Sequence, residues 1–270
     1  MSPRLFWNIL TVEARKRMSY RADFWINSVA GILVNFSVFW FLTQAMFAAS
    51  GRSNLGGFTP RGMVLYYVFA IVMGRIVQSN EMEMGIAQDI YDGSLSRYLI
   101  YPVPYAAVKF AEQAGWLAPQ VVQMILFGSL YPLIVGLPPE IHITPASVMM
   151  GLGSLALANV LHYLITLPIH AVAFWADNVW SLMVAERMAI SLLGGLLLPL
   201  DLFPGWVRQL LFWTPFPYLF SVPVRALMGK VSVTEWAAGF AITGVWCGVA
   251  ALAGHWVWRR GDLQYTGVGI

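Results

Sequence analysis

Long apolar runs separated by short polar segments dominate the chain. A helix that crosses the hydrocarbon core of a bilayer needs about 20 mostly apolar residues, and the runs predict six such spans. The predicted spans are residues 24–47, 63–79, 106–135, 146–174, 182–202 and 233–258. The third span is long enough to be tilted, or to be kinked around Pro119, because proline lacks a backbone donor and clashes with the preceding turn. The pattern predicts an all-α integral membrane protein, with a single transmembrane domain over residues 1–270.

Residues 2–21, before the first span, are too charged to cross a membrane. Their apolar side chains fall on one face of a helix: Leu5, Phe6, Ile9 and Val12. Basic residues opposite an apolar face favour lying flat on an anionic leaflet. We therefore expect an N-terminal interfacial amphipathic helix, the alternative being a solvated lead-in to the first span. The basic run at residues 15–17 argues against a cleavable signal peptide, which would be apolar there.

Residues 203–231 are too apolar for a water-facing loop and too interrupted to cross the bilayer. Pro215, Pro217 and Pro223 follow one another at intervals shorter than any spanning helix. Irregular backbone at membrane depth is tolerated where it is buried against protein. The segment therefore predicts a re-entrant hairpin of short helices on the extracytoplasmic side, between the fifth and sixth spans.

Composition supports the membrane assignment. Hydrophobic residues make up 59% of the chain and charged residues 11%, against roughly 45–50% and 25% in soluble domains. The single cysteine, Cys247, lies inside a predicted span and provides no disulfide framework. Basic residues gather at the ends of spans, which indicates membrane orientation and no nucleic-acid partner.

Lysine and arginine predict the orientation, because cytoplasmic segments of membrane proteins carry an excess of them. With both termini in the cytoplasm, nine of these residues are cytoplasmic: Arg4, Arg15, Lys16, Arg17, Arg21, Arg97, Lys109, Arg259 and Arg260. Five are then extracytoplasmic: Arg52, Arg61, Arg208, Arg225 and Lys230. We therefore expect both termini inside.

No catalytic constellation is present in the sequence. The chain has no G-x-x-x-x-G-K-[ST] phosphate loop, so it does not bind ATP in the usual Walker manner by itself. His162 and His170 are eight residues apart, which is not the i, i+4 spacing of a helical metal site. We expect the chain to have no catalytic residues, metal site or cofactor of its own.

The clearest functional surface is the segment 81–102 between the second and third spans, here called the elbow. Gly93 is placed to end one short helix in a left-handed cap, and a second short helix stops before Pro102. Its acidic side chains are Glu81, Glu83, Asp89 and Asp92. An acidic cytoplasmic segment gains nothing from anionic lipid and suits a protein partner with a complementary surface. A solvated connector is the alternative.

Together these features resemble the permease subunits of type-2 ATP-binding-cassette (ABC) exporters. Residues 198–207, L-P-L-D-L-F-P-G-W-V, with T-P-F-P-Y at 214–218, are similar to the family's proline-punctuated end of span five and the extracellular helices after it. Residues 85–102 are similar to the coupling-helix region of a small bacterial branch of these permeases, and residues 259–267 resemble that branch as well. The resemblance covers essentially the whole chain.

The resemblance implies a multi-pass permease of the bacterial cytoplasmic membrane that forms a dimer, either with itself or with a paralogue. Two copies of a separate ATPase subunit would drive it and would bind the ATP and Mg. The elbow would sit in the ATPase cleft and convert its closure into rearrangement of the spans. The implied coupling residues are Glu83, Gly85, Ile86, Asp89, Asp92, Gly93, Arg97 and Leu99.

Polar side chains inside the spans are costly and tend to face protein or water. We expect seven of them to line a translocation path at the interface between two permeases: Asn35, Gln44, Gln113, Gln120, Gln123, Asn159 and His162. The alternative is hydrogen bonding between helices, worth about 0.6 kcal/mol per contact. Gly244 and Gly248 form a G-x-x-x-G face, which we expect to pack against another helix of the same chain, the alternative being a dimer interface.

Two other functions are compatible with these residues. An ion-coupled secondary transporter would show repeated halves and an embedded ionisable residue, for which Glu112, early in the third span, comes closest. A membrane anchor for a mechanical ATPase would share the elbow but would need no polar path. The substrate is not specified by the sequence.

Overall fold

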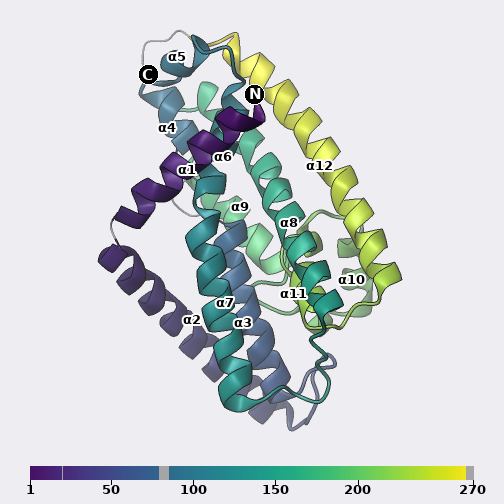
Figure 1. The fold of residues 1–270 in the computed structure, drawn as a ribbon. Coiled ribbons are helices and arrows are strands. Elements are labelled where there is room, and N and C mark those ends of the chain that lie inside the picture. The colour runs from purple at the N-terminus through teal and green to yellow at the C-terminus, as the bar shows by residue number, and fades with distance from the viewer. Residues whose placement is uncertain (20, 79–84, 266–270) are drawn as a thin grey trace.

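The structure, a computed structural model, describes residues 1–19, 21–78 and 85–265. It is 78% helix, and the described ranges contain no strand (Figure 1). The helices are α1 (Pro3–Ser19), α2 (Arg21–Ser50), α3 (Pro60–Val77), α4 (Gly85–Tyr91), α5 (Leu95–Leu99), α6 (Tyr105–Gly115), α7 (Leu117–Val135), α8 (Pro145–Ala171), α9 (Trp180–Leu193), α10 (Gly205–Phe212), α11 (Ser221–Leu227) and α12 (Val233–Asp262). Short 3-10 turns, η1 (Val172–Phe174), η2 (Leu200–Leu202) and η3 (Phe216–Tyr218), join some of them.

Within the described part of the chain, five helical segments are long and apolar enough to cross a membrane. They are Trp25–Ser50, Pro60–Val77, Tyr105–Val135, Pro145–Phe174 and Val233–Asp262. Each overlaps one of the predicted spans, so the all-helical membrane fold is confirmed. The exact count of six is not, because the remaining predicted span, 182–202, takes a different form.

The predicted fifth span is not a single helix, which corrects the prediction for residues 182–202. Helix α9 ends at Leu193, and the chain turns at two glycines. A Cβ atom at Gly194 would lie 2.5 Å from the carbonyl oxygen of Ile190 and 2.8 Å from the ring of Phe220. Gly195 has φ 91°, a left-handed conformation that glycine adopts without strain. The helix stops here because Phe220, from a later segment, packs against the turn.

The third span is broken between α6 and α7, at Trp116. Pro119 lies three residues further on and cannot donate a hydrogen bond to the carbonyl of Gly115, the last residue of α6. The predicted interruption is therefore present, one turn before the proline that causes it.

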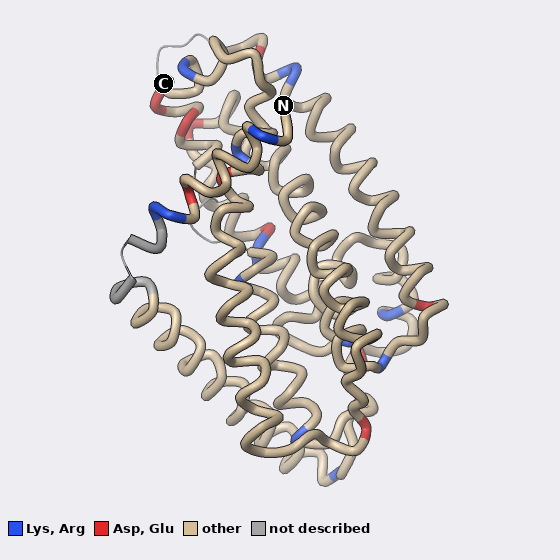
Figure 2. The backbone as a smooth tube through the Cα atoms, in the orientation of Figure 1, with Lys and Arg blue, Asp and Glu red and all other residues tan. Residues whose placement is uncertain are grey.

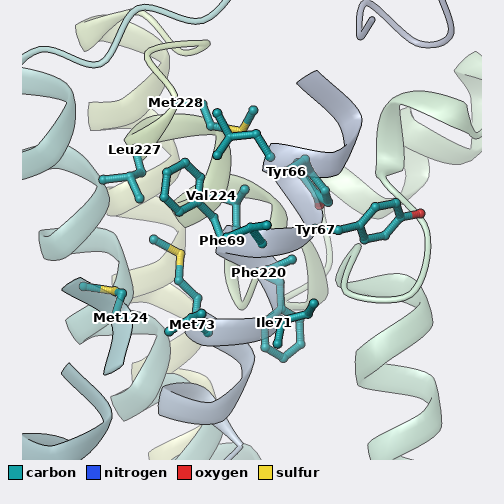
Figure 3. Close-up of a cluster of buried hydrophobic side chains, with 14 of the residues drawn as sticks. Tyr66, Tyr67, Phe69, Ile71, Met73, Met124, Phe220, Val224, Leu227 and Met228 are labelled. Carbon is teal, nitrogen blue, oxygen red and sulfur yellow. The ribbon is translucent and has the colours of Figure 1, made fainter. Parts of the chain in front are cut away.

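Helix α3 lies at the centre of the bundle, with 83% of its span buried against 22% for the spans of α2 and α12. Its aromatic and aliphatic side chains pack against those of α7, α8 and α11 (Figure 3). The hydroxyl of Tyr66 donates to the carbonyl of Gly195 at 2.7 Å, and the ring of Tyr67 stacks on Phe39 at 4.3 Å. Helix α3 therefore joins α2 to the turn that follows α9.

The two ends of the bundle differ in what they hold. Helices α1, α4 and α5 and the end of α12 gather at one end, here called the elbow end, while the loops 51–59 and 136–144 lie at the opposite end (Figure 1). Charged residues are concentrated toward the two ends, and the long helices between them are mostly uncharged (Figure 2). This distribution suits a bundle that crosses a bilayer.

Helix α1, predicted as amphipathic, divides its apolar side chains between protein and solvent. The ring of Phe6 lies 6.2 Å from that of Phe110 on α6, whereas Trp7 and Val12 are each 63% exposed.

The short helices of residues 203–231 differ in what their apolar side chains contact. Helix α11 packs against α8 and α3, while α10 exposes large apolar side chains.

Gly244 and Gly248 of α12 do not pack against another helix of the chain. A Cβ atom built at either position meets nothing within 4 Å. Close approaches occur at other glycines, among them Gly254 of α12, where a Cβ would lie 3.4 Å from the side chain of Leu167 on α8, and Gly151 of α8, where it would lie 2.8 Å from the Cβ of Leu227 on α11. The G-x-x-x-G spacing shows that two small residues share a face, but it does not show which element lies opposite.

Candidate functional site

The elbow consists of α4 and α5 joined by a tight turn. Gly93 has φ 71°, so the predicted left-handed end of the first short helix is confirmed. Ile86, Ile90 and Leu95 are buried against α8, η1 and α9 in an apolar cluster of their own, separate from the core around α3. The elbow is therefore packed against the ends of the long helices.

An ion pair fixes α4 to the start of the third span. The Lys109 ammonium lies 2.7 Å from Oδ2 of Asp89 and 3.2 Å from Oε2 of Glu112, and the lysine side chain is only 7% exposed. The hydroxyl groups of Tyr105 and Ser94 also donate to the Asp89 carboxylate, at 2.6 and 2.8 Å. Asp89 is thus held on several sides by partners from this chain.

These partners determine the charge state of Asp89. Burial raises its pKa, but hydrogen bonds from Lys109, Tyr105 and Ser94 together lower it by more, so the pKa lies below its ordinary value of 3.8. A carboxyl group whose pKa is lowered on folding stabilises the fold at pH values above the unfolded-state pKa. That stabilisation is lost as the pH falls through the folded-state pKa.

Aromatic side chains attach the elbow to the end of α12. The ring of Tyr105 stacks on Trp258 at 5.0 Å, and Trp258 meets Phe174 of η1 edge-on at 5.3 Å. The hydroxyl of Tyr265 lies 3.2 Å from the backbone nitrogen of Ser96, which donates to it. The elbow, the third span, the end of the fourth span and the last helix therefore form one connected unit, here called the elbow base.

The sequence points to Ile86 and Asp89 of the elbow base but not to the residues that hold them. It indicates Lys109 only as an orienting charge and assigns no contact to Tyr105, Trp258 or Tyr265. Lys109 follows Tyr105 by one helical turn, which places both on one face of α6. A lysine and a tyrosine on one helix face, close in the chain to an acidic segment, are a signal from which the Lys109–Asp89 ion pair could have been predicted.

The predicted coupling residues divide into a buried set and an exposed set. Ile86 is buried and Asp89 is paired, while Gly85 and Gly93 are half-buried. Glu83 falls outside the described residues. Asp92, Arg97 and Leu99 are exposed, and they are followed by Ile100 and Tyr101 at 79% and 61% exposure. The elbow therefore presents a mixed charged and apolar tip, residues 92–101, on a packed base.

The seven predicted path residues do not share one surface within the chain. Five are buried in it: Gln113, Gln120, Gln123, Asn159 and His162. Asn35 and Gln44 are both exposed on α2, but nine residues separate them, which places them on opposite sides of the helix. The structure thus exposes two of the seven on α2 and buries five among the packed helices.

The buried members take part in contacts between helices. The Nε atom of Arg75 on α3 donates to Gln120 at 3.4 Å, and its Nη2 donates to Ser28 on α2 at 3.0 Å. Asn159 donates to the carbonyl of Ile76 at 2.8 Å. Gln123 is fully buried, and neither of its amide atoms has a partner among the described residues.

A profile described as "ABC-2 family transporter protein" matches residues 33–269, which include the elbow, the core around α3 and the last helix. The chain belongs to the ABC-2 transporter family. A search of curated proteins gave no significant match. The match covers most of the chain and confirms the predicted resemblance to type-2 ABC permeases.

As an ABC-2 permease, the protein is a multi-pass membrane component of a transporter and is not itself an ATPase. Members of this family normally work with ATPase partners in the membrane. An element that projects from the bundle, and is packed to several of its long helices, therefore has the form needed to contact such a partner.

Replacing Asp89 tests the ion pair of the ABC-2 permease. Removing one member of a buried pair typically costs about 3–5 kcal/mol, and we expect Asp89→Asn to cost roughly 2–3 because Glu112 still faces Lys109. Thermal unfolding in detergent should show this loss in full between pH 5 and 8, because the Asp89 pKa is lowered. The difference should shrink below about pH 4, as the carboxyl group of the wild type becomes protonated.

Asp92→Asn is the matched control, since this neighbouring carboxylate is exposed and its removal should leave the unfolding temperature nearly unchanged. If the stability difference between Asp89→Asn and the wild type vanished near pH 6 or 7, the titrating group would be a histidine. That result would contradict the assignment of the pH dependence to the Asp89 carboxyl group.

Proposed function

We propose that this ABC-2 permease is the membrane-spanning subunit of an ATP-driven exporter. The observation that best supports this is the elbow, with its exposed tip on a base packed to α6, η1 and α12. In the proposal two ATPase subunits bind the elbows of two permeases, identical or paralogous. The complex lies in the bacterial cytoplasmic membrane with both termini of the permease in the cytoplasm.

Contact with the ATPase would involve the tip of the elbow. Asp92 and Arg97 offer opposite charges, and Leu99, Ile100 and Tyr101 offer apolar surface. Interfaces commonly combine an apolar centre with a charged rim, and the charges choose the partner and its orientation. Gly93 would set the angle between α4 and α5, and Ile86 would hold α4 in place by packing against the bundle.

Coupling would then follow from packing. ATP and Mg are held in the partner subunits, and closure of those subunits would push on the tip. Asp89, through Lys109 and Tyr105, would transmit the displacement to α6, while Trp258 and Tyr265 would transmit it to α12. Because packed side chains deform little, the inner ends of these helices would move together.

The path would form where an exposed side of α2 meets the second permease. Asn35 and Gln44 are exposed on opposite sides of α2, so the side that meets the second permease would bring one of them into the path, and a polar group there would not have to face lipid. The buried residues Gln113, Gln120, Gln123, Asn159 and His162 would line the path only after the helices separate. Helix α9, the turn after it and the short helices of residues 203–231 would together make the fifth crossing and the re-entrant hairpin.

The alternative function, an ion-coupled secondary transporter, has less support. Glu112, the residue most suited to ion coupling, lies 3.2 Å from the Lys109 ammonium. A carboxylate paired in this way is a poor carrier for an ion that must be bound and released.

Charge reversal at the tip tests the proposed partner. We expect Asp92→Arg combined with Arg97→Glu to abolish co-purification of a Walker-containing ATPase with the tagged chain, because both side chains are exposed and the contact is charge-selective. The unfolding temperature of the variant should match the wild type. The control Arg52→Glu, an exposed charge at the opposite end of the bundle, should retain the ATPase. Retention by the double variant, or purification of the wild type without an ATPase, would contradict the proposal.

Cross-linking tests the proposed dimer face. The only cysteine is Cys247, so Cys247→Ser provides a background in which a new cysteine reports alone. We expect Asn35→Cys or Gln44→Cys to form a disulfide-linked dimer on mild oxidation in membranes, since two copies of α2 would face one another. Leu252→Cys on α12, at a position 73% exposed, should stay monomeric. Cross-linking at Leu252→Cys but at neither position of α2 would place the dimer interface at α12 and contradict the proposed dimer face.

A further inference from the structure

A cleft with charged walls lies between α10, α11 and the start of α12. Its polar lining includes Asp201, Arg208, Arg225 and Glu235, and its apolar lining includes Phe212 and Tyr218. The cleft volume is about 350 Å³, which is enough for a small polar headgroup. It is far from the elbow and is not part of the proposed coupling unit (Figure 1).

The two faces of α10 are chemically different. Trp206, Leu210 and Trp213 are 72%, 63% and 70% exposed and lie at i, i+4 and i+7, on the outward face. Arg208 and Phe212, four residues apart, line the cleft on the other face. Exposed tryptophans and leucines in a membrane protein are typical of a helix placed at the membrane interface. The cleft therefore opens beside a helix that suits contact with lipid.

The two acidic groups of the cleft differ in how far they are engaged within the chain. Oε2 of Glu235 accepts hydrogen bonds from the backbone nitrogen and the hydroxyl of Ser232, at 2.9 and 2.8 Å, in the cap of α12. Oδ1 of Asp201 lies 3.7 Å from Nη1 of Arg225, while its Oδ2 is buried without a partner among the described residues. The Asp201 side chain is 13% exposed and that of Arg225 is 38% exposed, so the arginine is the more accessible of the two.

The cationic groups are more available. Across the described residues, no ion pair or side-chain hydrogen bond engages the guanidinium group of the exposed Arg208. Asp201 approaches one end of the Arg225 guanidinium, and Nε of Arg225 has no partner in the described part of the chain. The opening of the cleft thus presents two guanidinium groups that are not fully neutralised. Basic groups near the membrane interface are suited to pairing with anionic lipid headgroups.

We infer that this cleft binds the phosphate group of an amphiphile, with Arg208 and Arg225 holding the phosphate and Phe212 facing its apolar part. Guanidinium groups bind phosphate through paired hydrogen bonds of fixed geometry, which a lysine would not reproduce. Phe212, on the cleft side of α10, and the exposed Trp206, Leu210 and Trp213 on its outward side would offer apolar surface to an acyl chain that leaves the cleft. The inference depends on residues 203–231 lying in the membrane, as proposed above, and not on ATP-driven transport.

Native mass spectrometry of the purified chain in an uncharged maltoside detergent provides the test. The probes are dioctanoyl phosphatidic acid, dioctanoylglycerol, which lacks the phosphate, and inorganic phosphate. We expect one phosphatidic acid to be retained per chain and dioctanoylglycerol to bind far more weakly. Because charge-assisted bonds would be lost, Arg208→Gln should weaken retention by about tenfold, and Arg208→Lys should restore it only in part.

Arg52→Gln is the matched control, since it removes an exposed positive charge outside the cleft and should leave retention unchanged. Equal binding of dioctanoylglycerol would overturn the role of the phosphate. Inorganic phosphate competing as well as the lipid would make the site one for free phosphate and overturn the amphiphile. Unchanged retention by Arg208→Gln would also overturn the inference. Among the described residues no ion pair or side-chain hydrogen bond engages Arg208, so the variant should unfold at the wild-type temperature. The mass spectrum separates the permease with and without an ATPase subunit, and lipid is counted on the permease freed of ATPase, so the outcome is separate from that of the proposed function.

Discussion

The buried ammonium group of Lys109 constrains how the elbow end of the bundle is built. Removing an ammonium from water is costly unless carboxylates and hydroxyl groups replace the water, and Asp89, Glu112 and the hydroxyl of Tyr98 supply that replacement at 2.7, 3.2 and 3.3 Å. Two of these partners belong to the elbow and one to the same helix as the lysine. The requirement to neutralise one charge therefore holds α4, α5 and α6 in a single arrangement. Tyr105 extends this arrangement to α12 through its stacking on Trp258.

The opposite half of the bundle is organised by apolar packing. Helix α3 is surrounded, and its Tyr66 bonds to the turn at Gly195, so that turn is held against the centre of the core. Within the helices of this core lie the buried polar contacts of Arg75 with Ser28 and of Asn159 with the carbonyl of Ile76. Such contacts between helices are individually weak, and they can exchange partners more readily than a close-packed core. In the proposed transporter, these contacts are where displacement at the elbow would change the relation between helices.

Hydropathy and turn chemistry predicted the five long segments, the interruption near Pro119 and the left-handed Gly93, because each depends on local sequence. The end of α9 could not be predicted, since it depends on Phe220 packing against Gly194 from a distant segment. The elbow was located correctly as a distinct unit, but the role of Asp89 depends on Lys109, 20 residues away. Likewise, the sequence shows that Asn35 and Gln123 are polar residues within spans. It does not show that Asn35 is exposed and Gln123 buried, because tertiary packing decides this. Their assignment to a path stays a prediction.

The central claim is that the elbow and the inner ends of α6 and α12 move as one body when the partner ATPase closes. Pulsed electron paramagnetic resonance on the assembled complex tests this most directly, with spin labels at Gln88→Cys on α4 and Leu263→Cys after α12 in the Cys247→Ser background. Both labelled positions are exposed, and position 263 is 89% so. The account predicts the same narrow distance distribution without nucleotide and with bound ATP. A distance that shifts or broadens on ATP binding would show that the elbow moves independently of the helices and would contradict the claim.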